Sequence, residues 1–403
     1  MNFSDPIAAL EIGTSRTVVA IGEPLEGGRV RVAAVGAIPS NGVRKSQIVD
    51  IAQARYSVES VLKRLADQSD YAIGQAFLVV SGPQIRTKSV VAQCPVDGGK
   101  VRDEHLAEVD ARSYEMGLAS DREAIELAPI GYQLDDIVDI ASPKDMNGHL
   151  LSLRSLCIHG SAQRLADARN AAHAAKLELL PETYFAGTCA AAAVLTAQNK
   201  RDGALVIDLG GGSTAFTAWS GGRLVQAGVV GVGGDHVTSD IRIAFSVSQA
   251  QAEHLKTAAA SALIRPEDAQ QRVAVPDPMP GFKAASISRR ALNTVVNARL
   301  QELFAVIRAK LDEEGRLHEL NAGVVLTGGG AALPGVADLA RTVFGCGVRV
   351  GTLVPEIEGL EGEAHPAACA VFAGLLLLAQ QEGRPSSSLF DSVKKALGGI
   401  FRK

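Results

Sequence analysis

Several common signatures are missing from this sequence of 403 residues. No basic segment followed by a long apolar stretch opens the chain, so a secretory signal is not expected. The longest apolar run, AACAVFAGLLLLA from Ala367, has 13 residues; it is too short to cross a bilayer and predicts a buried helix. The absence of a C-x-x-C pair argues against a zinc site or a disulfide framework and favours reduced core thiols. These absences predict a cytoplasmic protein. The five cysteines are Cys94, Cys157, Cys189, Cys346 and Cys369.

Most of the chain also lacks an excess of positive charge. The net charge is −4, and the last fifteen residues carry four basic groups against one acid, which leaves about −7 for the rest. No basic stripe marks the body, so a nucleic-acid partner is not expected. With 47% hydrophobic and 21% charged residues, the sequence is typical of a globular protein with two to four compact domains.

Two well-known nucleotide motifs are absent as well. The chain contains no G-x-x-x-x-G-K-[ST] segment, and no dinucleotide fingerprint opens its first predicted helix. What it contains instead is a repeated hairpin. AALEIGTSRTVVAIG near the start and GALVIDLGGGSTAFTAWSGGRL from Gly203 share an apolar strand, an acid, a glycine turn and a second strand, with Glu11 and Asp208 in equivalent positions. The repeat predicts two duplicated α/β domains that face each other across a cleft.

The chemistry of these turns suits a phosphate ligand. Glycine allows positive φ and a close approach of the backbone, and neighbouring N–H groups and hydroxyls donate to phosphate oxygens. A carboxylate at the end of the strand can hold a hydrated Mg²⁺ ion. A third turn, VVLTGGGAALPGV from Val324, offers further N–H groups to an adenosine or an α-phosphate.

In this order the three turns resemble the first phosphate, second phosphate and adenosine motifs of the actin-like ATPase superfamily. Within it the chain most resembles the FtsA family of bacterial cell-division proteins, over nearly its whole length. LVVSGPQIRTKSV (78–90) and the stretch 118–153 are similar to the inserted subdomain 1C of that family. GVVGVGGDHVTSDIRIAF (228–245) and SQAQAEHLK (248–256) are similar to the segments that enter its subdomain 2B.

The resemblance implies an α/β, actin-like duplicated ATPase fold with two lobes around a nucleotide cleft. Subdomain 1A would comprise residues 1–83, 163–199 and 366–382, and subdomain 1C residues 84–162. Subdomain 2A would comprise residues 200–235 and 321–365, and subdomain 2B residues 236–320. A linker at 383–388 would lead to an amphipathic membrane-targeting helix at 389–403. From the residues alone, 288–310 predicts a long amphipathic helix, and 273–282, with three prolines, predicts a loop.

The resemblance also implies the residues that contact ATP and Mg²⁺. Glu253 and Lys256 resemble the pair that holds the ribose and adenine, although three residues apart on a helix they also fit a solvated salt pair. Glu11 and Asp208 would hold Mg²⁺, mainly through water. The remaining ATP contacts would be Gly13, Thr14, Ser15, Arg16, Gly210, Gly211, Gly212, Ser213, Thr214, Gly234, Gly328, Gly329 and Gly330.

Some of these positions are open to another interpretation. Arg16 stands where the family often has lysine, and it is either a phosphate contact or a surface arginine. Glu11 replaces the usual aspartate, and the extra methylene would disturb the geometry of metal and water, so the sequence predicts at most weak ATP hydrolysis. Asp235 is either a helix N-cap, which the sequence favours, or a general base of the type found in sugar kinases. No catalytic residue is predicted; Thr188 is only a guess for a water-positioning group, and His159, His236 and His365 are expected to be structural.

The C-terminal stretch SSSLFDSVKKALGGIFRK predicts a basic amphipathic helix. At about 100° per residue its six large apolar side chains fall within an arc of about 120°. Ser388 and Asp391 form a plausible cap, and the alternative is a helix packed on the protein's own body. The residues expected at the membrane are Leu389, Phe390, Val393, Lys394, Lys395, Leu397, Ile400, Phe401, Arg402 and Lys403.

The resemblance therefore implies an ATP-binding membrane adaptor of cell division. Its implied partners are FtsZ, whose C-terminal peptide would bind subdomain 2B, further copies of the chain in actin-like filaments, an anionic membrane surface, and other division proteins through subdomain 1C. It would lie at the cytoplasmic face of the cell membrane, at the division site. Two alternatives remain open: a PilM-like pilus-assembly scaffold, and a small-molecule kinase of the same fold.

Overall fold

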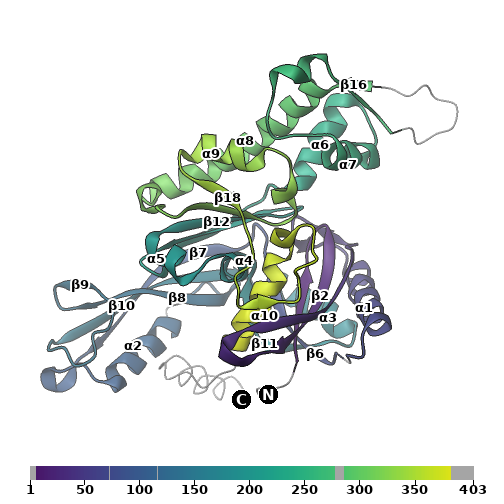
Figure 1. The fold of residues 1–403 in the computed structure, drawn as a ribbon. Helices are drawn as coiled ribbons and strands as arrows, with labels where there is room; N and C mark the ends of the chain where they lie inside the picture. Colours follow the sequence, from purple (N-terminus) through teal and green to yellow (C-terminus); the bar gives the residue numbers. More distant parts are fainter. Residues whose placement is uncertain (1–5, 72, 116, 277–285, 383–403) are drawn as a thin grey trace.

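The chain folds into two lobes, each built around a β-sheet (Figure 1). The computed structural model describes residues 6–71, 73–115, 117–276 and 286–382. The first sheet consists of β1 (Ile7–Ile12), β2 (Arg16–Pro24), β3 (Val30–Pro39), β6 (Gln75–Val80), β11 (Glu178–Phe185) and β19 (Ile357–Glu358). The second consists of β12 (Ala204–Leu209), β13 (Thr214–Ser220), β14 (Arg223–Val230), β17 (Gly323–Thr327) and β18 (Val348–Val350).

The two sheets share one strand plan. Their orders are β11-β6-β1-β2-β3-β19 and β18-β17-β12-β13-β14. In each, an antiparallel three-stranded meander is extended on one side by two strands that run parallel to its first strand. Glu11 pairs with Val18 in the first hairpin, and Asp208 pairs with Ala215 at the same place in the second. The predicted duplication is thus confirmed.

Two helices lie between the sheets and join the lobes. The helices α4 (Ala186–Val194) and α10 (Ala370–Glu382) share one apolar core with Ala20 of the first sheet and Val206 of the second. A Cβ on Gly374 would overlap the carbonyl oxygen of Cys189, so the two helices cross very closely. The apolar run from Ala367 forms the end of η6 (Pro366–Cys369) and most of α10, which confirms the predicted buried helix.

The outer faces of the sheets are covered by other helices. The helices α1 (Ile51–Gln68) and α3 (Ala162–Ala174) pack on the first sheet, and α8 (Arg289–Glu313) and α9 (Val336–Phe344) pack on the second. The predicted helix 288–310 corresponds to α8, which Ser288 caps by accepting a hydrogen bond from the backbone of Ala291. Most apolar side chains of the predicted stripe are buried, and Val295 is half-buried. The buried ones are Leu292, Val296, Leu300, Leu303, Phe304 and Ile307.

The far end of the second lobe contains α6 (Gly234–Phe245), α7 (Gln249–Ala258), β15 (Arg272–Ala274) and β16 (Ser286–Ser288). The prediction of a loop at 273–282 is wrong at its start, because Val273 and Ala274 pair with β16. The rest of that loop from residue 277 lies outside the described residues. Shorter elements are β4 (Val43–Arg44), β5 (Gln47–Ile48), α5 (Ala197–Asp202), η1 (Glu26–Gly28), η2 (Asp97–Gly99), η3 (Pro266–Gln270), η4 (Leu317–Glu319) and η5 (Gly329–Ala332).

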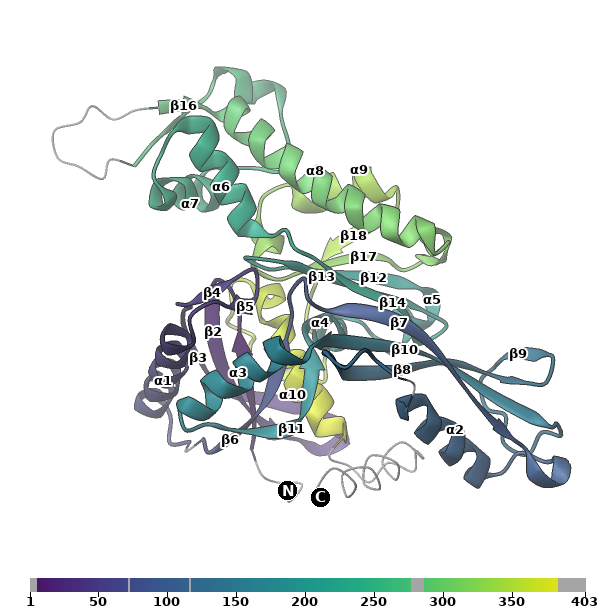
Figure 2. The same ribbon diagram turned by 180° about the vertical axis from the view of Figure 1, so that it is seen from behind.

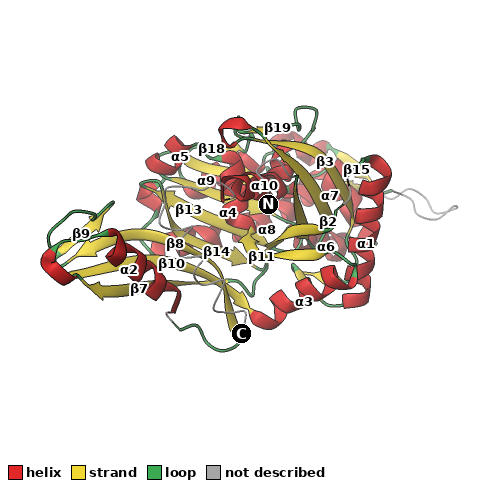
Figure 3. Ribbon diagram, turned by 90° about the horizontal axis from the view of Figure 1, so that it is seen from below, coloured by secondary structure: helices red, strands yellow, loops and turns green. Residues whose placement is uncertain are grey.

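A third sheet projects sideways from the two lobes (Figures 2 and 3). It is inserted between β6 and β11 in the order β7-β10-β8-β9, and α2 (Asp103–Glu115) covers one face. Its strands are β7 (Arg86–Pro95), β8 (Arg122–Leu134), β9 (Ile137–Ile140) and β10 (Leu150–Ser161). The exact subdomain boundaries stay a prediction.

Within the described ranges, no helix combines the length and apolarity that a membrane crossing requires. The predicted linker and membrane-targeting helix, with every residue expected at the membrane, lie outside those ranges. Four of the five cysteines are buried and Cys346 is half-buried, as expected of core thiols.

One buried acid stands out in the inserted sheet. Asp110 of α2 is 3% exposed, and its Oδ1 has no hydrogen-bond partner among the described residues. Burial raises its pKa from 3.8 to about 6. Burial of Tyr132 on β8, and then the charge of Asp110, raise the pKa of this tyrosine to about 12. The native state therefore binds the Asp110 proton more tightly than the unfolded chain does.

We expect Asp110→Asn to change how stability depends on pH. Because the folded pKa lies above the unfolded one, the wild type loses stability as pH rises through about 6, and the amide removes that loss. From pH 4.5 to pH 8 the free energy of unfolding of the variant should rise relative to wild type by about 2 kcal/mol. Urea denaturation of both proteins at several pH values measures the difference, and a constant difference would contradict the prediction.

Candidate functional site

A cavity of about 630 Å³ opens between the two lobes. This volume falls within the range typical of small-molecule sites. Its walls come from the turns after β1, β12 and β17, and from the starts of α6 and η6 together with one face of α7. All three glycine turns that were predicted from the sequence therefore meet at one place.

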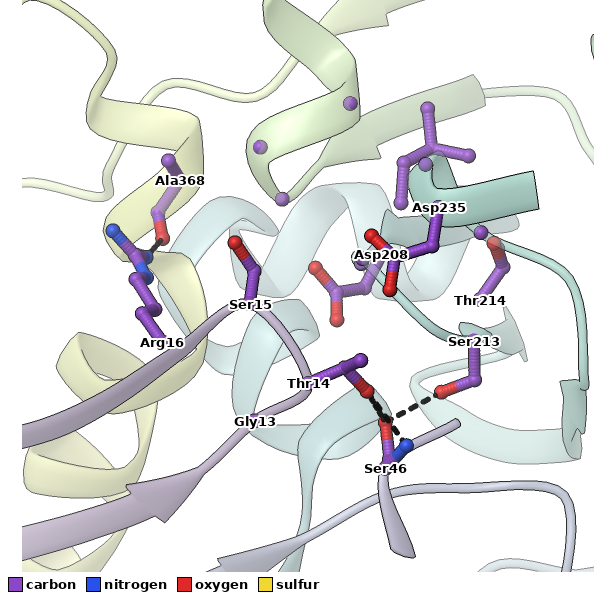
Figure 4. Close-up of a pocket in the computed structure, with 18 of the residues that line it drawn as sticks. Gly13, Thr14, Ser15, Arg16, Ser46, Asp208, Ser213, Thr214, Asp235 and Ala368 are labelled. Atoms are coloured by element: carbon purple, nitrogen blue, oxygen red, sulfur yellow. Dashed lines mark hydrogen bonds between the residues drawn. The ribbon is translucent and has the colours of Figure 1, made fainter. Parts of the chain in front are cut away.

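The first turn, Gly13 to Arg16, is held tight by a hydrogen bond from the N–H of Gly13 to the carbonyl of Arg16, 3.0 Å long. Thr14 and Ser15 line the cavity. The Arg16 side chain also lines it and donates to the carbonyl of Ala368 in η6 (Figure 4). The guanidinium is thus fixed beside the cavity, not free on the surface.

The second turn is packed against the start of α6. The N–H groups of Gly234 and Asp235 donate to the carbonyls of Gly210 and Gly211, at 2.9 and 2.8 Å. A Cβ on Gly233 would lie 2.5 Å from the Gly211 oxygen, so this approach requires glycine. The prediction that Asp235 is the N-cap is wrong: Gly233 is the N-cap, and Asp235 is the second residue of the helix and lines the cavity.

Two carboxylates face each other at the base of the cavity. Asp208 is buried and accepts a 3.3 Å hydrogen bond from Thr327, and Glu11 Oε2 is buried without a partner among the described groups. Burial, and then the charge of Glu11, raise the pKa of Asp208 to about 7. Burial also raises the pKa of Glu11, and nearby Arg16 opposes the shift. Both carboxyl groups therefore bind a proton more tightly than they would in water.

This donor set suits a hydrated divalent cation. In the described part of the chain, no group of three or more acidic, histidine or cysteine side chains is placed to hold a metal ion. Mg²⁺ is usually held by one or two carboxylates together with waters and phosphate oxygens. The unpaired Oε2 of Glu11 beside Asp208 fits that arrangement.

A polar cluster forms the wall that belongs to α6 and α7. Lys256 donates to Glu253 at 2.7 Å, to the hydroxyl of Thr238 at 2.8 Å and to the carbonyl of Gly234 at 3.3 Å. The Thr238 hydroxyl lies 2.6 Å from the same Glu253 oxygen. Lys256 is mostly buried and Glu253 is about half exposed, so the pair is solvated on its Glu253 side only, and both residues line the cavity.

Most, but not all, of the predicted site residues lie on the cavity. Every predicted ATP or metal contact lines it except Gly212, which faces the β4–β5 turn. Thr188 is buried away from the lining and donates to Glu126 and to the carbonyl of Phe185. His159 and His236 accept hydrogen bonds, from Arg122 and from the Gly233 N–H, as expected of structural histidines. His365 lines the cavity, and its structural role stays a prediction.

Two family models of known proteins match segments of this chain. The family model described as "Cell division protein FtsA" matches residues 205–373, and a second, "SHS2 domain inserted in FTSA", matches residues 82–159. The chain belongs to the FtsA family. Proteins of that name from Escherichia coli (strain K12) and Streptococcus pneumoniae (strain D39) are 28% and 29% identical to it. The first alignment covers 92% of this chain and 89% of the relative, and the second covers 98% and 86%.

Solved structures confirm the actin-like fold of this FtsA-family chain. A PilM-PilN type IV pilus biogenesis complex matches with a TM-score of 0.61 at 16% identity, over 93% of this chain and 98% of the other. MreB5 of Spiroplasma citri bound to ADP matches with a TM-score of 0.53 at 14% identity, over 94% and 97%. At these identities the likeness shows the fold alone.

Among the cavity residues of the FtsA-family chain that were not predicted as ligand contacts are Ser46, Ser81 and His365. Ser46 belongs to the short β4–β5 turn, and Ser81 follows the end of β6. Ser81 could have been found, because the ends of parallel neighbouring strands meet at the same sheet edge as the first glycine turn. Ser46 and His365 carry no comparable signal, because each reaches the cavity through long-range packing.

The third turn provides a test with a matched control. Gly328 has φ +79°, and a Cβ there would lie 2.6 Å from both Asp208 Oδ1 and the Leu209 carbonyl. We expect Gly328→Ala to lower the free energy of unfolding by about 1–3 kcal/mol and to weaken ligand binding. A Cβ on Gly329 would meet no atom within 4 Å, so Gly329→Ala should be nearly neutral. Thermal denaturation of the two variants checks this, and equal melting temperatures would contradict it.

Proposed function

We propose that this FtsA-family protein binds ATP with Mg²⁺ in the cavity between its lobes and acts as a membrane adaptor of bacterial cell division. The observation that carries the proposal is the meeting of three glycine turns and two buried carboxylates on one cavity. The turns offer N–H groups and hydroxyls to phosphates, and the carboxylates offer charge to the cation that phosphates bring. Nucleotide-bound MreB5 structures of the same fold support the choice of ligand.

Different residues of the chain would contact different parts of the nucleotide. The first turn and the second turn would hold the β- and γ-phosphates from opposite lobes, with Arg16 fixed by Ala368 to neutralise charge. Glu253 and Lys256 would hold the ribose and adenine beside the third turn. Bound Mg²⁺ would supply positive charge to the phosphates. We assign no general base, and with glutamate at position 11 the protein is at most a weak ATPase.

The adaptor role rests on the family and on the tail. We infer that copies assemble into actin-like filaments, that subdomain 2B takes the C-terminal peptide of FtsZ, and that subdomain 1C meets other division proteins. The basic amphipathic stretch at 389–403 would hold this assembly on the anionic cytoplasmic face of the cell membrane, at the division site. The fold likeness to the PilM-PilN complex favours a pilus-assembly scaffold as the second candidate.

Co-sedimentation separates the two candidates. Liposomes containing phosphatidylglycerol are mixed with FtsZ and either the full chain or a chain truncated after Gln381. The adaptor role predicts that FtsZ pellets with liposomes only when the full chain is present. If FtsZ stays in the supernatant although the full chain pellets, the FtsZ role is excluded and the scaffold role gains support.

A further inference from the structure

The turn between β4 and β5 has a backbone that its residues do not favour. Lys45 has φ 50° and Ser46 has φ 55°. Two consecutive residues with positive φ at the tip of a two-residue hairpin correspond to a type I′ turn, which usually contains asparagine or glycine. Such strain persists only where the surroundings hold it, and it concentrates at functional sites.

The turn lies between the two lobes at the phosphate end of the cavity. The N–H of Ser46 donates to the Thr14 hydroxyl at 2.7 Å, and the Ser46 hydroxyl lies 2.9 Å from that of Ser213 (Figure 4). A Cβ on Gly212 would lie 2.7 Å from the Cα of Lys45. Ser46 therefore links the first phosphate turn to the second, and its hydroxyl faces the cavity between them.

On its other side the turn connects to the base of the inserted sheet. Gln47 donates to the side-chain oxygen of Gln84 at 3.1 Å, and Gln84 donates to the Ser81 carbonyl at 2.9 Å. Arg122, the first residue of β8, donates to the Gln84 carbonyl at 2.8 Å and to His159 of β10 at 2.9 Å. A path of hydrogen bonds, joined by the covalent links through Gln47 and Gln84, thus runs from the cavity to the start of the inserted sheet.

The inserted sheet also rests on the second lobe. Thr87 of β7 donates to the Ala227 carbonyl of β14 at 3.3 Å. A separate contact joins the sheet to α4, the helix between the two main sheets, where Thr188 donates to Glu126 of β8 at 2.8 Å. A change in the angle between the lobes would therefore move the base of this sheet against β14. Ser46 contacts Thr14 of the first lobe and Ser213 of the second, so a change in the angle between the lobes would alter these contacts as well.

We infer that Ser46 recognises the terminal phosphate of a bound nucleoside triphosphate, and that Gln47 and Gln84 transmit its position to the inserted sheet. The inference rests on the proposed nucleotide binding. A γ-phosphate between the first and second turns competes for the hydroxyls that Thr14, Ser46 and Ser213 now share, so Ser46 donates to it. A diphosphate leaves the Ser46–Ser213 bridge in place.

Ser46→Gly tests the recognition step. Glycine accepts the φ of this position, so the variant keeps the turn and loses the hydroxymethyl side chain that carries the hydroxyl. Competition with a fluorescent ADP analogue, in Mg²⁺, gives the affinities of ADP and of a non-hydrolysable ATP analogue. We expect the preference for triphosphate over diphosphate to fall about tenfold, as is typical when a hydrogen bond to a charged group is lost. An unchanged preference overturns the inference. Failure of the wild type to bind either nucleotide refutes instead the proposed function.

Gln84→Ala tests the transmission step, since Gln84 lies outside the lining of the cavity. Hydrogen exchange of residues 122–126 and 156–161 is compared with ADP and with the ATP analogue bound. We expect a nucleotide-dependent difference in the wild type that is lost in Gln84→Ala, while the variant keeps wild-type affinities for both nucleotides. Ser40→Ala, which removes a hydroxyl bonded to Thr17 in the first lobe, is the matched control and should keep the difference. A difference that persists in Gln84→Ala overturns the transmission step.

Discussion

Asp208→Asn is expected to remove most of the Mg²⁺-dependent affinity for ATP and, at the same time, to stabilise the nucleotide-free protein. The two effects have one cause. Burial, and then the charge of neighbouring Glu11, raise the pKa of Asp208 to about 7. In the proposed complex with Mg²⁺ and phosphates, both charges would face the cation. Without them, the Asp208 charge destabilises the fold.

The sign of the stability effect follows from the pKa. Because the folded pKa of Asp208 lies above 3.8, stability is lost as pH rises through about 7, so the gain from Asp208→Asn should be larger at pH 8 than at pH 6. The amide keeps an oxygen that can accept from Thr327. The loss of affinity should be tenfold to a hundredfold, the usual range for a charge-assisted contact of about 1.5–3 kcal/mol.

Calorimetric titration with ATP, in Mg²⁺ and in a chelator, measures the first effect, and thermal unfolding measures the second. In the chelator, wild type and Asp208→Asn should bind ATP with similar weak affinity. Asp240→Asn is the matched control, since Asp240 pairs with Arg299 outside the cavity lining and should keep the full dependence on Mg²⁺. A variant that binds MgATP as tightly as wild type would contradict the metal role of Asp208.

Local chemistry made much of the site predictable from the sequence. The sequence contains an acid followed by a glycine turn twice, with the same spacing of apolar residues. This pattern predicts a strand, the strand that pairs with it, and the turn between them that would contact a ligand. For this reason Glu11 and Asp208 could be aligned and then found at equivalent positions of two sheets with one strand plan. The long apolar period of 288–310 specified α8 in the same way.

The rest depended on contacts between distant segments. Ser46 reaches the cavity because the β4–β5 turn packs on Gly212, more than 160 residues away, and two consecutive non-glycine residues at positive φ leave no turn signature in the sequence. Asp235 resembled an N-cap, but Gly233 took that place because only glycine fits against the Gly211 carbonyl. Gly212 lies in the second glycine turn, as predicted. It packs against Thr14 and Lys45 of the first lobe and therefore does not line the cavity.

Truncation after Gln381 is expected to remove nearly all binding to anionic liposomes. The removed segment, residues 382–403, contains five basic residues. Four of these lie at 389–403, together with six large apolar residues that fall within an arc of about 120° of the predicted helix. Each basic residue gains about 1 kcal/mol near an anionic leaflet, and the apolar arc adds partial burial. Sedimentation with vesicles that contain phosphatidylglycerol measures binding, and neutral phosphatidylcholine vesicles should retain little protein. Equal sedimentation of the full and truncated chains would contradict the membrane role.

Two point variants separate the apolar arc from simple charge. Leu397→Glu places an acid within the arc, and Ser392→Glu adds the same charge outside it. If the arc enters the membrane, Leu397→Glu should lose most of its binding and Ser392→Glu only a part; equal losses would mean that charge alone holds the protein.

Assembly should then decide how firmly the tail holds. Under the proposed function, a single tail should bind weakly, whereas many tails on one filament should bind firmly through effective concentration, without any new contact. Addition of ATP should therefore increase liposome binding of the wild type more steeply at high than at low protein concentration. Asp208→Asn should keep the weak binding of the single tail and lose the increase, because only the nucleotide step has been removed. An ATP-dependent increase that survives in Asp208→Asn would show that the tail and the cavity act independently.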